Sequence, residues 1–232
     1  MQEKIIAIVL AGGQGKRMQS HIQKQYMELK GYPVLYYSLK EFEESDVDGI
    51  VLVVGKGEIS YCQKEIIEKY GFQKVVAIVE GGNERYESVY CGLKAIEAGD
   101  YVLIHDGARP LLTQAIIKAS IEGVKKYRAC VVGMPVKDTI KVIDKEGFAK
   151  ETPDRSTLWL MQTPQSFTVP LVTKAYEEMM KVEDNTITDD AMVVEKYGNH
   201  PIKLLKGSYE NIKITTPEDL MVAECLLSMR MR

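Results

Sequence analysis

The chain of 232 residues is predicted to adopt an α/β fold with a mostly parallel, twisted sheet that is covered by helices on both faces. Short apolar segments rich in β-branched residues alternate along the chain with segments whose apolar residues recur at helical spacing. Glycines follow the first and third apolar segments directly, at Gly12 and Gly81. Neither a repeat nor a linker divides the sequence, so we expect one domain over residues 1–232.

Strands are expected where apolar residues run without interruption, as they do in strands that are buried on both faces. These segments are residues 5–10, 50–54, 75–79, 101–105 and 129–132. Helices are expected at residues 35–44, 60–70, 87–98 and 113–127. The fourth helix has the clearest periodicity, because Ile116, Ile117, Ile121 and Val124 share one face.

A final helix is expected to begin after Thr216. Thr216 is a typical N-cap residue, Pro217 suits the first helical position, and Asp219 stands three residues after the cap.

Residues 136–152 interrupt the alternation of strands and helices. Two short apolar runs there flank a turn that contains Gly147, which is the pattern of a β-hairpin. The hairpin has too few apolar residues for a core of its own. We therefore expect an arm over about residues 136–158 that protrudes and packs on a twofold-related copy of the chain. The alternative is a hairpin that stays free on the surface.

Composition and charge exclude several classes of protein. A net charge of −3 gives no field that would attract nucleic acid, and no apolar run approaches the roughly 18 residues of a membrane span. The four cysteines are widely separated, which is typical of a reduced, cytoplasmic protein. The three histidines are scattered as well, so a zinc site is not expected.

The first predicted strand ends in a glycine loop that also carries basic residues. Gly12, Gly13 and Gly15 expose backbone N–H groups that can surround an anion. Arg17 and Lys24 add positive charge that the backbone alone does not supply. This combination predicts a triphosphate-binding loop at the carboxyl end of a buried strand. An ordinary strand-to-helix connection is the alternative.

Two common glycine motifs do not fit this loop. A P-loop needs Ser or Thr after its Gly-Lys pair, whereas Gly15-Lys16 is followed by Arg17. A dinucleotide-binding fingerprint needs a third glycine where this chain has Met18, and an acidic residue at the end of the second strand. These departures argue against a nicotinamide-dependent dehydrogenase.

Two further loops follow predicted strands and carry charged residues. One contains Gly82, Arg85 and Ser88, and the other contains Asp106 and Arg109. Because ligands of open α/β sheets bind outside the carboxyl ends of the strands, we expect the three loops to converge on one crevice. The carboxylate is a natural ligand for Mg²⁺, and the arginine of the same loop can bind a phosphate with two parallel hydrogen bonds.

Lys213 lies between two β-branched residues, Ile212 and Ile214. This pattern favours a short strand with the amine pointing inward.

Eight motifs along the chain resemble the 2-C-methyl-D-erythritol 4-phosphate cytidylyltransferase family of the non-mevalonate isoprenoid pathway. The resemblance extends over about residues 5–226. In order, the motifs are Ala-Gly-Gly-x-Gly-x-Arg-Met, Lys-Gln-Tyr, Gly-Gly-x-x-Arg-x-x-Ser-Val-x-x-Gly-Leu, His-Asp-x-Ala-Arg-Pro, Pro-Val-x-Asp-Thr-Ile-Lys, Leu-Trp-x-x-Gln-Thr-Pro-Gln-x-Phe, Thr-Asp-Asp-Ala and Asn-Ile-Lys-Ile-Thr-x-Pro-Glu-Asp-Leu.

The resemblance implies a Rossmann-like nucleotidyltransferase domain, Mg²⁺ as cofactor and a homodimer held through the arm. It implies that CTP and the polyol phosphate give a CDP-alcohol and pyrophosphate. Arg17 and Lys24 would stabilise the transition state, while Arg155 and Lys213 would position the substrate phosphate. The nucleotide would be held by Ala11, Gly12, Gly13, Gly15, Gly82, Arg85 and Ser88, the substrate by Arg109, Thr139, Thr163 and Thr188, and the metal by Asp106. Thr139 and Arg155 would serve the site of the partner subunit.

The chain departs from the family pattern at two positions near these residues. Gln23 stands where the family often has Pro, which could loosen the loop that carries Lys24. Gly107 replaces a commoner Ala, which could give the backbone beside Asp106 more freedom.

Three other functions compete with this interpretation. A ribitol-phosphate cytidylyltransferase shares most of the motifs, but Leu158-Trp159 and the Thr-Asp-Asp-Ala motif at Thr188 favour the erythritol family. A nucleotide-sugar glycosyltransferase needs an Asp-x-Asp pair after a strand, whereas Asp46-Val-Asp48 precedes one. An inactive nucleotide-binding module is disfavoured because every expected cation is retained.

Overall fold

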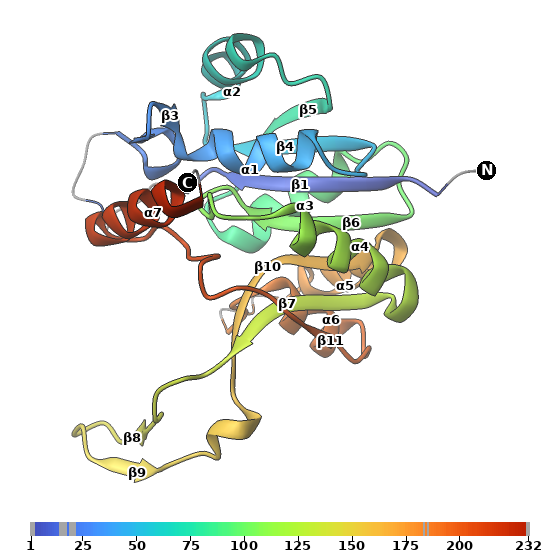
Figure 1. The fold of residues 1–232 in the computed structure, drawn as a ribbon. Helices are drawn as coiled ribbons and strands as arrows, with labels where there is room; N and C mark the ends of the chain where they lie inside the picture. Colours follow the sequence, from blue (N-terminus) through green and yellow to red (C-terminus); the bar gives the residue numbers. More distant parts are fainter. Residues whose placement is uncertain (1–2, 14–17, 19–21, 183, 185, 231–232) are drawn as a thin grey trace.

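The computed structural model describes residues 3–13, 18, 22–182, 184 and 186–230. Among these residues, one sheet holds the strands in the order β11-β7-β10-β6-β1-β4-β5 (Figure 1). Its members are β1 (Ile5–Ala11), β4 (Gly49–Val54), β5 (Val75–Glu80), β6 (Tyr101–Asp106), β7 (Ala129–Pro135), β10 (Trp159–Thr168) and β11 (Lys203–Lys206). All neighbours except those of β10 are parallel. The predicted α/β fold with a mostly parallel sheet is confirmed.

The register of the parallel strands brings their carboxyl ends to one edge. Leu10 of β1 pairs with Asp106 of β6, and Ala11 pairs with Val54 of β4. The loops after these strands therefore start at the same level. This edge is where the sequence predicted that the three charged loops converge.

Strand β10 is an element that the sequence pattern did not predict. It lies between β6 and β7 and is antiparallel to both. Its buried residues include Gln162, Thr163, Gln165 and Ser166, so it lacks the apolar run of its neighbours. Helices α5 (Val169–Met179) and α6 (Asp190–Tyr197) follow it and were not predicted either.

Helices cover both faces of the sheet. On one face, α1 (Val34–Glu43) and α4 (Gln114–Tyr127) bury Leu39 and Ile117 among the side chains of β1 and β4. On the other face, α3 (Arg85–Lys94), α5 and α6 pack through apolar residues such as Val89, Val172 and Val193. The carboxyl-terminal helix α7 (Pro217–Arg230) packs on a third cluster, which includes Leu29, Val34, Leu111, Ile214 and Ala223.

The observed helix limits differ from the predicted ones for local reasons. Helix α3 begins two residues early, because Glu84 and Glu87 form a reciprocal capping box at its start. The predicted helix 60–70 is instead α2 (Ile59–Tyr61) followed by the π-helical segment η3 (Cys62–Glu68). Helix α7 begins at Pro217 as predicted, and the Asp219 carboxylate accepts a hydrogen bond from the backbone N of Thr216 at 2.8 Å.

The remaining short elements lie outside the main sheet. The turn η2 (Lys24–Tyr26) precedes a two-stranded ribbon of β2 (Glu28–Leu29) and β3 (Tyr32–Pro33). No helix in the described part of the chain is long and apolar enough to cross a membrane.

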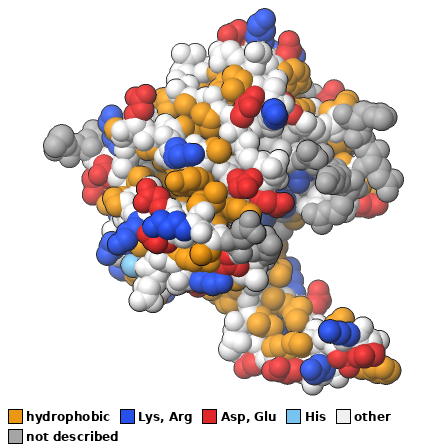
Figure 2. Space-filling view, turned by 180° about the vertical axis from the view of Figure 1, so that it is seen from behind, with side chains coloured by type: hydrophobic (Ala, Val, Ile, Leu, Met, Phe, Trp, Pro, Cys, Tyr) orange, Lys and Arg blue, Asp and Glu red, His pale blue; other side chains and the backbone are white. Residues whose placement is uncertain are grey.

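The predicted arm is confirmed as a protruding hairpin (Figure 1). Its strands β8 (Val142–Ile143) and β9 (Ala149–Glu151) pair only with each other, and η4 (Arg155–Thr157) leads back to the main sheet. Apolar side chains are exposed along it, with 60% of Ile143 and 72% of Phe148 accessible. Figure 2 shows apolar side chains gathered on this extension.

Candidate functional site

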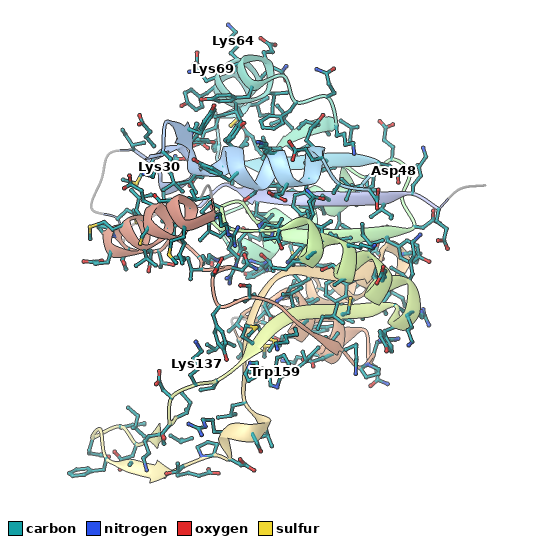
Figure 3. All side chains as sticks on the ribbon, viewed as in Figure 1. Lys30, Asp48, Lys64, Lys69, Lys137 and Trp159 are labelled. Atoms are coloured by element: carbon teal, nitrogen blue, oxygen red, sulfur yellow. The ribbon has the colours of Figure 1, made fainter. Side chains whose placement is uncertain are left out.

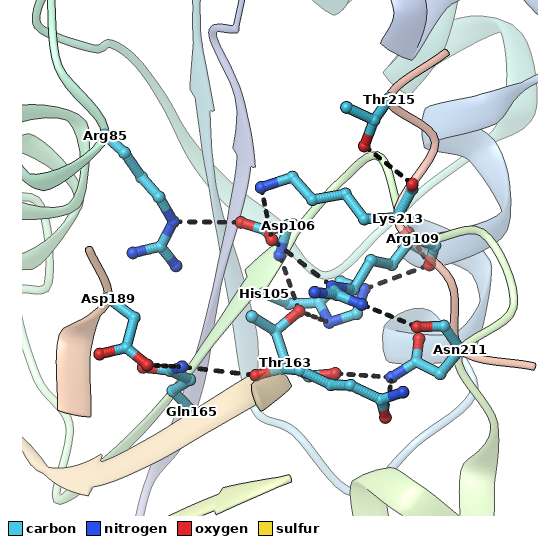
Figure 4. Close-up of polar contacts among 12 residues, drawn as sticks. Arg85, His105, Asp106, Arg109, Thr163, Gln165, Asp189, Asn211, Lys213 and Thr215 are labelled. Carbon is cyan, nitrogen blue, oxygen red and sulfur yellow. Dashed lines mark hydrogen bonds and ion pairs between the residues drawn. The ribbon is translucent and has the colours of Figure 1, made fainter. Parts of the chain in front are cut away.

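Three cations surround the carboxylate of Asp106 at the carboxyl end of β6 (Figure 4). Its Oδ1 accepts a hydrogen bond from Arg85 Nε at 3.2 Å, and its Oδ2 lies 2.9 Å from Lys213 Nζ. Arg109 Nε is 3.5 Å from the same Oδ2. The Asp106 cluster (Arg85, Asp106, Arg109 and Lys213) thus confirms that the loops after β5 and β6 converge.

The electrostatics of the Asp106 cluster favour the charged forms of Asp106 and Arg85. Burial alone would raise the pKa of Asp106, but Arg85, Lys213 and Arg109 outweigh it and hold the pKa well below its usual range. Burial would likewise lower the pKa of Arg85, yet Asp190 and Asp106 keep it above its ordinary value. Three cations face two carboxylates, so positive charge is in excess and the cluster suits a phosphate.

The segment that carries Lys213 is not a strand, so the predicted strand is wrong there. One backbone hydrogen bond, from Ile214 N to the carbonyl oxygen of Ala108 at 2.8 Å, docks it onto the loop after β6. A single bond of this kind does not extend a sheet. The predicted inward direction of the amine is confirmed, because the Lys213 ammonium meets Asp106.

A buried chain of hydrogen bonds through Thr163 and His105 fixes the loop after β6. The hydroxyl of Thr163 accepts from Asp106 N at 3.1 Å and lies 2.9 Å from His105 Nδ1. His105 Nε2 lies 3.3 Å from the carbonyl oxygen of Arg109. Since a carbonyl oxygen can only accept, Nε2 carries the proton and Nδ1 accepts from the Thr163 hydroxyl. Both imidazole nitrogens are therefore engaged.

The pH dependence of folding should carry the signature of His105. Burial lowers the pKa of His105 from 6.5 to about 4, so the unfolded chain takes up a proton at a higher pH than the folded protein does. The stabilisation is full above pH 6.5 and is lost as the pH falls from 6.5 toward 4. We expect a loss of about 3 kcal/mol in the free energy of unfolding from this group.

Urea denaturation at several pH values in metal-free buffer measures this effect. The His105→Gln variant removes the titrating group, so its stability should depend less on pH over the same interval. Asp106 contributes only at lower pH, because its stabilising ionisation is lost below its unfolded pKa of 3.8. Equal slopes for the two proteins between pH 6.5 and 4 would contradict the assignment.

The carboxyl end of β1 holds the turn that carries Lys24. Gln25 is buried, and its side-chain amide donates to the carbonyl oxygen of Ala11. A Cβ at Gly13 would lie 3.9 Å from Lys24 Cε, which places the lysine stem beside the glycine loop. The predicted residues Gly15 and Arg17 lie outside the described residues.

The residues at the two departures from the family pattern make defined contacts in the structure. The Gln23 side chain accepts a hydrogen bond from Gln25 Nε2 at 2.8 Å, which ties it to the turn of Lys24. Gly107 N donates a hydrogen bond to Leu10 O at 2.9 Å. A Cβ there would come within 2.8 Å of Leu35 Cδ1, so the close packing at this position favours glycine.

The predicted nucleotide loop after β5 presses against the first turn of α3. A Cβ on Gly82 would collide with the side chain of Glu87, whose carboxylate accepts from Asn83 N at 2.7 Å. Ser88 is buried, and its hydroxyl donates to the carbonyl oxygen of Glu84 at 3.1 Å. A role for Gly82 and Ser88 in nucleotide binding stays a prediction.

The remaining predicted substrate residues lie in different surroundings. Thr163 is buried beneath Asp106, while Thr188 is exposed just before α6. Thr139 and Arg155 are exposed on the arm, and Arg155 Nη1 donates to the carbonyl oxygen of Lys137 at 2.8 Å. Figure 3 labels Lys137 and Trp159 at the base of the arm.

The Asp-x-Asp pair of a glycosyltransferase is ruled out by position. Asp48 precedes β4, and its carboxylate accepts from the backbone N of Ile5 at 2.7 Å. It therefore lies at the amino edge of the sheet, away from the arm and from α7 (Figure 3). Asp46 and Asp48 do not share the edge that carries Asp106.

Sequence reasoning missed two residues of this region. Asp190 is fully buried and binds Arg85 through both oxygens, each at 2.8 Å. Asn211 is also buried, and its backbone carbonyl oxygen accepts a hydrogen bond from Arg109 Nη1 at 2.7 Å. Asp190 belongs to the Thr-Asp-Asp-Ala motif. A search among the motifs for an acidic partner of Arg85 could therefore have found Asp190.

Comparisons with known proteins agree with this geometry. The family model described as 2-C-methyl-D-erythritol 4-phosphate cytidylyltransferase matches residues 5–229. The protein of that name from Lachnoclostridium phytofermentans is 53% identical, with 97% of each chain covered. The one from Lachnospira eligens is 55% identical over 95% of this chain and 98% of its own. The crystal structure of 4-diphosphocytidyl-2C-methyl-D-erythritol synthase from Anaerococcus prevotii superposes with a TM-score of 0.86 at 34% identity, covering 97% of this chain and 96% of that one.

Proposed function

The chain belongs to the 2-C-methyl-D-erythritol 4-phosphate cytidylyltransferase family, and we propose that the Asp106 cluster is the phosphate site of its reaction. The enzyme transfers a cytidylyl group from CTP to 2-C-methyl-D-erythritol 4-phosphate and releases pyrophosphate, as the names and identity of its relatives support. The product belongs to the synthesis of isoprenoid precursors by the non-mevalonate route.

The excess of cations around Asp106 is the observation that carries this proposal. The attacking phosphate and the triphosphate are both anionic, so they repel each other unless positive charge lies between them. Lys213 is held at 2.9 Å and Arg109 at 3.5 Å from the same carboxylate oxygen. This fixes both cations before substrate binds, so little reorganisation is needed when charge develops. Lys213 would position the phosphate that attacks, and Lys24 would stabilise the charge on the α-phosphate.

The reaction needs no general base, because a phosphate monoester is already ionised near neutral pH. The structure supports this view, since the imidazole beside the Asp106 cluster has both nitrogens engaged by Thr163 and Arg109. His105 is also kept neutral by burial, with its pKa lowered to about 4. Catalysis would then rest on positioning and electrostatics.

The donor set fits Mg²⁺ that takes most of its ligands from the nucleotide. In the described part of the chain no three His, Cys, Asp or Glu side chains gather as a metal site. One carboxylate together with phosphate oxygens and waters is nevertheless a common Mg²⁺ environment, and Asp106 would be that carboxylate. When bound, Mg²⁺ would neutralise charge on the departing pyrophosphate.

A homodimer in which each arm completes the neighbouring site is the second part of the proposal. Exposed apolar residues of the arm, among them Val142, Ile143 and Phe148, have no core of their own to enter. The predicted substrate residues Thr139 and Arg155 are exposed on the same arm. A second copy of the chain would bury the apolar residues of the arm, and its site would bind substrate through Thr139 and Arg155.

The proposal that the enzyme works in the cytoplasm is supported by its cysteines. All four, Cys62, Cys91, Cys130 and Cys225, are free thiols. Free thiols suit a reducing compartment.

A screen of nucleoside triphosphates against polyol phosphates tests the proposed function. With 2-C-methyl-D-erythritol 4-phosphate we expect CTP to exceed ATP and GTP at least roughly 10-fold in kcat/KM, because the proposed slot for the base lies at the loop of Gly82, which packs closely against Glu87. Pyrophosphate release is the measurement. Equal turnover with ATP would contradict the cytidylyl assignment, and preference for ribitol 5-phosphate would favour the ribitol enzyme. No release with any pair would leave an inactive nucleotide-binding module.

A further inference from the structure

Arg85 divides its guanidinium between two carboxylates that come from different parts of the fold. Its Nη1 and Nη2 donate to the two oxygens of Asp190 at 2.8 Å each. Its Nε donates to Oδ1 of Asp106 at 3.2 Å. The guanidinium therefore connects the start of α6 with the end of β6, and only one of its N–H groups is directed at Asp106 in these contacts.

Asp190 is itself fixed from several sides. It is the first residue of α6, has no exposed surface, and its Oδ1 accepts a hydrogen bond from the Tyr176 hydroxyl at 2.5 Å. On either side of it, Asp189 accepts from Gln165 Nε2 at 2.9 Å, and Ala191 N donates to Gln165 Oε1 at 2.9 Å. These contacts leave the Asp190 carboxylate little freedom to move. The Arg85 side chain must therefore extend to it for the pair to form.

The pairing has a consequence for the Asp106 cluster. A guanidinium that faces a single carboxylate prefers two parallel hydrogen bonds, one to each oxygen. If Arg85 bound Asp106 in this way, it would occupy Oδ2 as well as Oδ1. Oδ2 is the atom that meets Lys213 at 2.9 Å and Arg109 at 3.5 Å. Asp190 takes the two Nη groups and so leaves Oδ2 to the lysine and the second arginine.

We propose that Asp190, held by Tyr176, is a positioning residue for the transferase reaction: by engaging the two Nη groups of Arg85 it directs Oδ2 of Asp106 toward Lys213. The proposal rests on the function assigned above to the Asp106 cluster. Asp190 has no exposed surface, so it would act through Arg85 rather than by touching a substrate. Its effect should therefore depend on the presence of the Asp106 carboxylate.

A double-mutant cycle tests this dependence. The isosteric Asp190→Asn change weakens the hold on Arg85, and we expect kcat/KM for the polyol phosphate to fall at least roughly 10-fold. In an Asp106→Asn background, where no carboxylate is left to orient, the same change should cost less than about 2-fold. Steady-state pyrophosphate release at raised enzyme concentration measures all four proteins.

A matched variant separates positioning from packing. Val172→Ala removes buried apolar contacts from the core cluster that also contains Tyr176, and it leaves the side chains of Arg85 and Asp190 unchanged. We expect it to lower Tm while kcat/KM stays within about 2-fold of wild type. If Asp190→Asn does not fold, Tyr176→Phe replaces it, and its smaller loss of kcat/KM should again vanish in the Asp106→Asn background.

Two outcomes would overturn the proposal. Equal fold losses in both backgrounds, or an activity loss in Val172→Ala that matches Asp190→Asn, would assign Asp190 to packing alone. The wild-type protein is measured in the same assay. If it released no pyrophosphate from CTP and the polyol phosphate, the proposed function would fail instead, which is a different result from a fully active Asp190→Asn variant.

Discussion

Lys24→Ala should lower kcat roughly 10²- to 10³-fold, with a much smaller change in the Kd for CTP. The expected loss corresponds to about 2.7–4 kcal/mol, the usual cost of removing one preorganised donor from a developing charge. Lys24 is held for this task, since the turn η2 is tied to Ala11 by Gln25 and the lysine stem lies beside Gly13. The charge it opposes is greatest in the transition state, so the effect falls on kcat.

Steady-state kinetics and CTP titration measure the two quantities for Lys24→Ala separately. Lys64→Ala is the matched control, because it removes an exposed lysine on η3 rather than the one beside the glycine loop (Figure 3). It should keep kcat within about 2-fold. A Lys24→Ala variant with near wild-type kcat and much weaker CTP binding would make the lysine a ground-state anchor.

The carboxyl edge of the sheet could be predicted because it depends on local signals. Apolar runs locate the parallel strands, and parallel strands share one edge at their carboxyl ends. The glycines and charged residues that follow each run then have to meet. The contact of Arg85 with Asp106 follows from this logic, whereas the inward amine of Lys213 was predicted from its β-branched neighbours.

The half of the site around β10 could not be predicted in the same way. Strand β10 is polar, and its buried Gln165 is satisfied by Asp189 and by the backbone of Ala191. These partners lie more than twenty residues away, so no local pattern announces them. The pairing of Arg85 with Asp190 spans 105 residues. The resemblance implies that Arg85 holds the nucleotide, and the structure shows its guanidinium bound to two carboxylates.

The sequence predicts the fold of the arm but not which subunit the arm serves. Its turn glycine, Gly147, has a φ of +90° and its hairpin forms as predicted. Whether Arg155 serves its own chain or a neighbour depends on a second copy, which a pattern within one chain does not specify. Its hydrogen bond to Lys137 keeps it on the arm rather than at Asp106. That separation makes a direct experiment possible.

Mixing Lys24→Ala subunits with Arg155→Ala subunits should restore activity if arms serve neighbouring sites. In a mixed dimer, one site combines the intact Lys24 of one chain with the intact Arg155 of the other. After random exchange about half of the dimers are mixed, so about a quarter of all sites are complete. We expect the mixture to regain roughly a quarter of wild-type activity, well above either variant alone.

A second mixture controls for non-specific effects of subunit exchange. Lys213 contacts Asp106 within the same chain, and Lys24 lies beside the glycine loop of that chain. Lys24→Ala mixed with Lys213→Ala therefore leaves every site without one lysine, and no recovery is expected. Exchange is verified with differently tagged subunits. If the mixture with Arg155→Ala recovered no more than this control, each Arg155 would serve its own chain, and the arm would have to fold back toward its own Asp106 cluster when substrate binds.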